Sequence, residues 1–273
     1  MDIIEVNQGT CNRCGICAAC CPGRLIDIKP ADYPKPNEMS ELACIRCGHC
    51  VAVCPLGSLT HREMPVEQCP PVRKSLQITA EQCEHLFRSR RSIRVYENKL
   101  VPRDVMVRLI EIARYAPTGH NSQNVEWLVI DSAEKLQRLE EIGLDWVGWM
   151  IKNQPKMAAL FNMEKMLERG EKQKNIFLRG APVLVVAHAV KDNSIATVDG
   201  TIALTYLELA AKSMGLGGCW AGFVYFMANA FPPMIEALSL PHGHAACGCM
   251  MVGYPKYSYY RLPLRKPPHI TWH

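Results

Sequence analysis

The hydrophobic pattern changes along the chain and divides it into a short first part and a long second part. Before residue 62 the apolar runs are short, as in RLIDI and VAVCPLGSL. After residue 79 they are longer and have the period of a helix or the continuity of a buried strand. Between these parts periodicity fades, and Pro65, Pro70 and Pro71 are typical of a linker. The pattern predicts a small domain at residues 1–62, a linker at 63–78 and a larger domain at 79–273.

The larger domain contains signals for both helices and strands. Thr79 followed by Gln82 predicts a capping box at the start of a helix. Helical composition continues at residues 101–117, 132–178 and 195–215. In the first of these ranges, an apolar face is formed by Val105, Leu109, Ile112 and Ala113. Apolar runs at 126–131, 181–190 and 245–255 predict strands, and the second is so nearly continuous that we expect burial on both faces. Strands that alternate with long helices predict an α/β or α+β domain.

Eight cysteines in the first part form two runs with one spacing, C-x2-C-x2-C-x3-C-P. Structural zinc sites use paired cysteines separated by a longer loop, which these runs do not fit. The spacing is that of bacterial iron–sulfur proteins, in which three cysteines of a run bind one cluster and the fourth binds the other. We therefore expect two [4Fe-4S] clusters, one held by Cys11, Cys14, Cys17 and Cys54 and the other by Cys44, Cys47, Cys50 and Cys21. Residues 1–62 thus resemble a bacterial two-cluster ferredoxin, with Cys20 as a free neighbour.

Three stretches of the second part are candidates for ligand binding. RRSIR, residues 90–94, places two arginines and a serine on one side of an extended segment, which suits a phosphate, although a solvated basic surface has the same composition. APTGHNSQN, residues 116–124, offers amide donors and acceptors for a heterocycle or is an ordinary polar loop. GLGGCWAGF, residues 215–223, allows close backbone approach to a ligand but lacks dinucleotide-binding spacing.

In this order the three stretches resemble the nitroreductase-like FMN-binding family over roughly residues 82–270. The resemblance implies an α+β fold with a central, mainly antiparallel sheet, and a homodimer with two FMN sites at its interface. By this resemblance, the FMN phosphate, ribityl chain and pyrimidine edge are contacted by Arg90, Arg91, Ser92 and Arg94, and the phosphate also by Arg265 and Lys266. The isoalloxazine is contacted by Asn121 and Gln123 and by backbone N–H donors at Ala221 and Gly222. The flavin of the partner subunit is contacted by Pro117, Thr118 and Gly119. The chain departs from many members at Asn124-Val125, where they have Pro-Trp.

The two resemblances together imply a ferredoxin–nitroreductase fusion, in which the clusters pass electrons to FMN. Reduced ferredoxin or another low-potential donor would supply the electrons, and NAD(P)H remains open as a donor. FMN would reduce a small electron-poor acceptor such as a nitro compound, a quinone or an enone. Two alternatives remain open: a redox relay that serves a protein partner, and a flavin-modifying or dehalogenating enzyme.

Composition changes this interpretation little. The formal charge of +5 suggests nucleic acid, but two oxidised clusters with four thiolates each carry about −2 apiece, and there is no run of five like charges. The N-terminus lacks a secretory signal, and no apolar window of about eighteen residues indicates a membrane span. We therefore expect a cytoplasmic protein with neither a nucleic-acid nor a membrane partner.

One further stretch, PHGHAACGC at residues 241–249, is a candidate metal motif through His242, His244, Cys247 and Cys249. Its two cysteines alternate along a predicted buried strand. Small buried side chains therefore explain them better than metal ligation does.

Overall fold

The computed structural model describes residues 2–173 and 175–273, and the chain forms two compact units. The first comprises residues up to Ile78 together with residues 120–122, and the second comprises Thr79–Gly119 and Gln123–His273. Each unit has its own apolar core. The two units are therefore described separately.

The first unit is built from short elements. It contains two antiparallel strand pairs: β1 (Ile4–Val6) with β4 (Leu59–His61), and β2 (Ile26–Asp27) with β3 (Lys35–Pro36). Three helices of one turn are α1 (Ile16–Ala19), α2 (Ser40–Ala43) and α3 (His49–Ala52), and two 3-10 turns follow, η1 (Val66–Gln68) and η2 (Lys74–Leu76). The apolar core of this unit is correspondingly small.

The first unit contains an internal repeat, because Cys44 follows Cys11 by 33 positions and helix α3 follows α1 by the same interval. Gly15 and Gly48 occupy equivalent places directly before these helices, with φ of 72° and 71°. Only glycine adopts this left-handed conformation without steric cost, so the two glycines let each cysteine run turn sharply into its helix.

A four-stranded sheet forms the centre of the second unit, with strand order β5-β6-β8-β7 and antiparallel pairing throughout. The strands are β5 (Glu126–Ile130), β6 (Val183–Val190), β7 (Gly217–Trp220) and β8 (His244–Gly253). The predicted antiparallel sheet is thus confirmed. Every residue of β6 from Val183 to Ala189 is buried, which confirms the expectation that this strand is covered on both faces.

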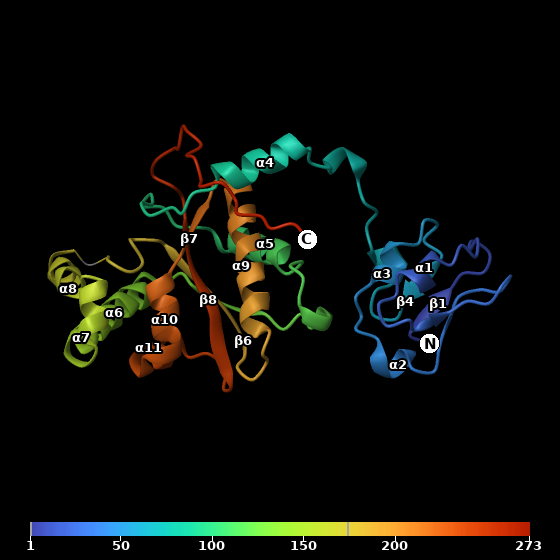
Figure 1. Ribbon diagram of the computed structural model, residues 1–273, viewed down its shortest axis with the longest axis horizontal. Helices are drawn as coiled ribbons and strands as arrows, with labels where there is room; N and C mark the ends of the chain where they lie inside the picture. The colour runs from blue at the N-terminus through green and yellow to red at the C-terminus, as the bar shows by residue number, and fades with distance from the viewer. Residues whose placement is uncertain (1, 174) are drawn as a thin grey trace. The chain divides into compact units, whose positions relative to one another are not determined.

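Helices cover both faces of this sheet (Figure 1). Helices α5 and α9 lie on one face, whereas α6, α10 and α11 lie on the other. The helices of the unit are α4 (Ala80–Ser89), α5 (Arg103–Ala113), α6 (Ala133–Asn153), α7 (Pro155–Leu160), α8 (Met163–Lys172), α9 (Ala196–Ser213), α10 (Gly222–Ala230) and α11 (Pro232–Leu238). The 3-10 turn η3 (Gly119–Asn121) begins in this unit, and its last two residues are grouped with the first unit. Two apolar layers separated by one sheet therefore make up the core.

Local signals in the sequence are visible in these helices. The capping box at α4 is confirmed: the Gln82 N–H donates to Thr79 Oγ1 (3.1 Å), and the Thr79 N–H donates to Gln82 Oε1 (2.9 Å). On α5 the buried residues are Met106, Leu109 and Ala113, so the apolar face is rotated from the predicted one. The packing of α5 against α9 sets this rotation. Among the described residues, no helix is both long and apolar enough to cross a membrane.

Candidate functional site

The eight predicted cluster cysteines gather around two cavities in the first unit. Each cavity is lined by three cysteines of one run and the fourth cysteine of the other run. The first set is Cys11, Cys14, Cys17 and Cys54, and the second is Cys44, Cys47, Cys50 and Cys21. Among the described residues, Cys20 is absent from both sets, and its thiol donates to the Cys17 carbonyl (3.5 Å). The fold therefore groups the sulfurs as two sets of four.

In each half of the repeat, one backbone N–H group donates to the sulfur of the first cysteine and another donates to the sulfur of the fourth cysteine. The N–H groups of Arg13 and Arg46 each lie 3.4 Å from the sulfurs of Cys11 and Cys44. At the fourth cysteines, the Leu25 N–H donates to Cys21 (3.4 Å) and the Ser58 N–H donates to Cys54 (3.2 Å). Such donors stabilise negative charge on a sulfur. Sulfur-rich cavities with N–H donors therefore fit two iron–sulfur clusters.

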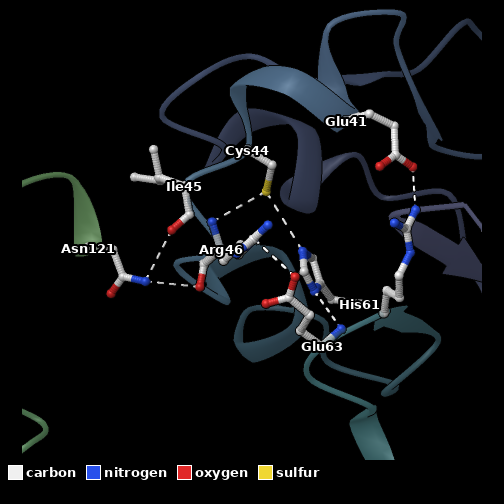
Figure 2. A network of polar contacts seen from close by, with 8 residues as sticks. Glu41, Cys44, Ile45, Arg46, His61, Glu63 and Asn121 are labelled. Atoms are coloured by element: carbon white, nitrogen blue, oxygen red, sulfur yellow. Dashed lines mark hydrogen bonds and ion pairs between the residues drawn. The ribbon is translucent and has the colours of Figure 1, made fainter. Parts of the chain in front are cut away.

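In the second half of the repeat, one sulfur also accepts a hydrogen bond from a side chain, that of His61. Its Nε2 lies 3.7 Å from Cys44 Sγ, and its Nδ1 lies 3.1 Å from the backbone nitrogen of Glu63 (Figure 2). The Glu63 N–H can only donate, so Nδ1 accepts and the proton resides on Nε2. His61, which is 1% exposed, therefore donates to the Cys44 sulfur. The equivalent position in the first half of the repeat is Ile28, which has no polar hydrogen to offer.

In the second unit, the RRSIR segment runs beside strand β7, where the Ile93 N–H donates to the Gly218 carbonyl (2.9 Å). Arg90 and Arg91 line a cavity together with Lys212, the glycine-rich stretch and the chain after Pro255. Arg91 Nε is shielded from solvent and has no hydrogen-bond partner among the described residues. A shielded donor without a partner, beside two further cations, suits an anion such as a phosphate group.

Two charged residues on the apolar-rich helix α9, Glu208 and Lys212, complete this cavity and were not predicted from the sequence. Glu208, 6% exposed, accepts from Arg90 Nη1 at 2.8 Å. Lys212 donates to the hydroxyl of Ser89. Burial raises the pKa of Glu208, whereas Arg90 opposes this rise, and burial lowers the pKa of Lys212. The sequence signal that could have identified Glu208 and Lys212 is a charged side chain on an apolar-rich helix, because burial of an unpaired charge is energetically costly.

A larger cavity of the same unit is lined by Arg94, Ala221 and Gly222 and by side chains of α6, α7, α8 and α10. The Ala221 N–H donates to the Cys249 carbonyl (2.8 Å), so it is not available to a ligand in this structure. Ala221 is instead the N-cap of α10, and the first N–H groups of that helix, beginning at Gly222, have no intrahelical partner. The Gly222 N–H therefore has no partner within its helix, Ala221 serves as the cap, and the role of Gly222 as a donor to a flavin stays a prediction.

Aromatic rings form one wall of this larger cavity. The ring centroid of Trp146 lies 5.8 Å from that of Phe223 and 5.7 Å from that of Phe226, and Phe161 meets Phe223 edge-on at 6.0 Å. Basic side chains also line the cavity, namely Lys165, Arg169 and Arg179. An apolar wall combined with a few cations suits a planar, electron-poor or anionic small molecule.

Segment 176–178, which contributes to this cavity, is held by the buried carboxylate of Glu140. That carboxylate accepts the N–H groups of Ile176 (2.9 Å), Phe177 (3.0 Å) and Leu178 (2.5 Å). Burial raises the pKa of Glu140, and the three N–H donors oppose this rise.

Replacing Glu140 with alanine is expected to destabilise the second unit by about 3 kcal/mol, because three buried N–H groups lose their acceptor. The five tryptophans all belong to this unit, so tryptophan fluorescence during denaturant unfolding measures its stability. The control is Glu141→Ala, which removes the neighbouring exposed carboxylate. Equal losses of stability in the two variants would contradict the prediction.

The predicted loop residues lie away from both cavities of the second unit. The Gly119 N–H donates to Asp199 Oδ1 on α9 (3.1 Å), and the Gln123 N–H donates to Thr118 Oγ1 (3.0 Å). Pro117, next to them, is exposed. Asn121 belongs to segment 120–122, which is grouped with the first unit. The fold thus does not bring this loop together with Arg90 or Gly222 within the second unit.

The remaining predicted residues are at the C-terminal end. Arg265 and Lys266 are exposed and lie beyond Leu262, the last residue that lines the Arg90 cavity. Ser92 is half-buried, and its carbonyl accepts from Arg94 (3.4 Å). The cysteines of PHGHAACGC are 4% and 0% exposed, as expected for small buried side chains.

Two relatives match just over three fifths of the chain. A protein of Methanothermobacter thermautotrophicus named "Putative NADH dehydrogenase/NAD(P)H nitroreductase" is 25% identical over 169 residues, which are 62% of this chain and 75% of the relative. A protein of the same name from Archaeoglobus fulgidus is 25% identical over 186 residues, 64% of this chain and 87% of the relative.

The fold is similar to that of a nitroreductase from Bacteroides fragilis crystallised with bound FMN, with a TM-score of 0.57 and 23% identity, covering 70% of this chain and 98% of the other. Among family models, the 4Fe-4S dicluster domain matches residues 3–55, and the Nitroreductase family matches residues 87–254. The second match covers more than half of the sequence and agrees with the antiparallel sheet and the cavities described above. This oxidoreductase chain, with its N-terminal dicluster segment, therefore belongs to the nitroreductase family.

Proposed function

We propose that the protein is an FMN-dependent oxidoreductase in which two [4Fe-4S] clusters in the first unit supply electrons to FMN in the second. The observation that carries the proposal is the grouping of eight cysteines around two cavities, each with three sulfurs from one run and one from the other. Clusters of this type transfer single electrons at potentials that can be very negative. FMN, when bound, accepts one or two electrons and can deliver a hydride.

The residues proposed to hold FMN are those around the two cavities of the second unit. Arg90 and Arg91 supply guanidinium groups for the phosphate, and Lys212 adds a third cation. Gly222 supplies a backbone donor at the start of α10, and Arg94 lies at the same cavity. The FMN-bound nitroreductase with a similar fold supports FMN as the ligand. Arg265, Lys266, Asn121 and Gln123 remain proposed ligands on the family resemblance.

The acceptor is proposed to be a small electron-poor molecule, such as a nitro compound, a quinone or an enone. A cavity with an aromatic wall beside Gly222 favours a small substrate. A relay that serves only a protein partner would need an accessible flavin and no such cavity for a small molecule. The role of this chain's residues is to contact the acceptor with aromatic rings and to stabilise, through Arg169 and Arg179, the negative charge that the acceptor gains on reduction.

We propose that the working form is a homodimer. The segment after Tyr257 is exposed throughout, including Leu264 (94%) and Trp272 (86%), and large exposed apolar side chains indicate a partner surface. The side-chain amide of Asn124 is shielded from solvent and has no partner among the described residues. Both features support a second copy that completes the loop at Pro117–Gly119. Light scattering combined with size-exclusion chromatography gives the molar mass that tests this.

The experiment that tests the function is an anaerobic reductive titration followed by visible absorption and EPR together. We expect about eight irons and one flavin per chain, with electrons that equilibrate between clusters and flavin. Reduced ferredoxin and NAD(P)H are then compared as donors. If the clusters are reduced while the flavin is absent or stays oxidised, the electron-transfer proposal fails. Net consumption of flavin would instead identify a flavin-modifying enzyme.

The hydrogen bond from His61 predicts that the two clusters differ in potential. A donor to a cluster sulfur stabilises the reduced state, so His61→Leu is expected to lower the reduction potential of the cluster held by Cys44. His61→Gln, which keeps an N–H donor, is expected to restore part of the shift. The control is Ile28→Val at the equivalent position of the repeat. An EPR-monitored redox titration measures both potentials, and a shift of equal size in the two clusters would refute the assignment.

A further inference from the structure

Three side chains of metal-ligand type lie together at one end of the central sheet. Glu126 is on β5, His188 on β6 and His244 on β8, so three adjacent strands contribute one residue each. One ligand atom from each residue lies within 4.8 Å of the others. The cluster shares no residue with either cysteine cavity or with the two cavities of the second unit.

The strand register brings these side chains to the same face of the sheet. Glu126 is directly opposite His188 in the β5–β6 pair, and Ala246 is opposite His188 in the β6–β8 pair. His244 precedes Ala246 by two positions, so it points to the same side. Because Ala246 is small, it leaves room for the His188 and His244 rings to meet. The two-residue period of each strand, together with the pairing, therefore builds the cluster.

The two imidazoles already face one another through ligand atoms. His188 Nδ1 and His244 Nδ1 are 3.0 Å apart, and the ring centroids are 5.2 Å apart. Ligand atoms that bind one tetrahedral ion at about 2.1 Å are roughly 3.4 Å apart. A side-chain movement of a few tenths of an ångström therefore brings both nitrogens to ligand distance.

The three side chains differ in their exposure to solvent. His188 is 4% exposed. Glu126 is exposed and His244 is half-buried, so the cluster opens to solvent on the side of the carboxylate. A cation can therefore enter from solvent and meet two nitrogens and one oxygen.

We propose that Glu126, His188 and His244 form a binding site for one divalent transition-metal ion of the zinc type. Two imidazoles with one carboxylate suit zinc better than magnesium or calcium, which prefer sets of oxygen ligands. Three protein ligands leave a fourth position for water at the solvent side. The bound ion links the edge strand β5 to β6 and β8.

The competing explanation is a hydrogen bond between the two imidazoles with no ion. In that arrangement one ring donates, the other accepts, and Glu126 has no part. The two explanations therefore differ in what Glu126 does. A zinc site requires its carboxylate, whereas a simple imidazole pair is indifferent to it.

The experiment uses the holoprotein with its iron and flavin contents measured before and after each step. Zinc is added at one equivalent per chain, and unbound zinc is removed by desalting. Zinc content, zinc K-edge X-ray absorption and competition with a chromophoric chelator then give stoichiometry, ligand type and affinity. The variants are Glu126→Gln and His244→Gln. The control is His242→Gln, because His242 is exposed, lies in the turn just before β8 and is outside the cluster.

We expect one zinc per chain with nitrogen and oxygen ligands in the parent protein and in His242→Gln. Loss of one ligand in Glu126→Gln or His244→Gln is expected to weaken zinc binding by about tenfold or more. Zinc is also expected to raise the unfolding temperature of the second unit in the parent but not in these variants. Zinc bound through sulfur, equal affinity in all variants, or no retained zinc in the parent would each overturn the proposal.

Discussion

Replacing Cys54 with alanine is expected to remove one cluster and to leave the other. Cys54 lies in the second cysteine run but lines the cavity of Cys11, Cys14 and Cys17. Iron content is expected to fall clearly below about eight per chain, and the four-iron signal of one cluster should disappear. The first unit should also become less stable, because its apolar core is small and metal ligation contributes to its folding.

The identity of the surviving cluster gives a sharper test than its presence. In Cys54→Ala, the remaining cluster is the one held by Cys44, so its potential should still respond to His61→Leu. In Cys21→Ala, the remaining cluster should be insensitive to that change. The matched control is Cys20→Ser, which should keep the full iron content. The reverse pattern would mean that each run binds its own cluster.

Replacing Arg90 with methionine is expected to destabilise the second unit by about 3 kcal/mol, because it leaves the buried Glu208 carboxylate without its partner. The same change should weaken FMN binding, since a guanidinium is lost from the proposed phosphate site. A double variant, Arg90→Met with Glu208→Met, separates the two effects. It should recover most of the stability, because an apolar pair of similar size replaces the ion pair, while FMN binding stays weak.

The pH dependence of the single variant follows from Glu208. Burial raises the pKa of this carboxyl, and Arg90 opposes the rise, so removing Arg90 raises the pKa further. A carboxyl whose folded pKa exceeds its unfolded pKa costs stability above the unfolded pKa and costs nothing below it. The loss of stability in Arg90→Met is therefore expected to shrink as pH falls. Unfolding followed by tryptophan fluorescence at several pH values measures this, and a constant difference would contradict it.

The glycine-rich stretch illustrates the limits of local pattern. Residues 217–220 of this stretch form strand β7 and residues 222–223 begin helix α10, whereas the sequence pattern predicts only that a ligand can approach its backbone closely. Gly217 and Gly218 are required for close packing, because a Cβ there would lie 2.2 Å from Ile93 and 2.9 Å from Met250. Spacing alone does not reveal such contacts. They depend on strands that are distant in sequence.

Local sequence patterns predict the chemistry of the first part and the general architecture of the second. Cysteine spacing predicts two clusters because ligand geometry leaves few ways to bind four irons with such short loops. The continuous apolar run of β6 predicts a doubly covered strand because both faces must avoid water. These features are readable because each depends on residues close together in the chain.

Which distant side chains meet depends on the three-dimensional packing of the chain. It pairs Arg90 with Glu208, directs His61 to Cys44, and assembles Glu126, His188 and His244 from three strands. Glu208, His61, Glu126 and His188 are ordinary polar side chains with no distinctive spacing in the sequence. Their proximity follows from strand register and helix packing, which are set by burial of the whole core and cannot be read from any local segment.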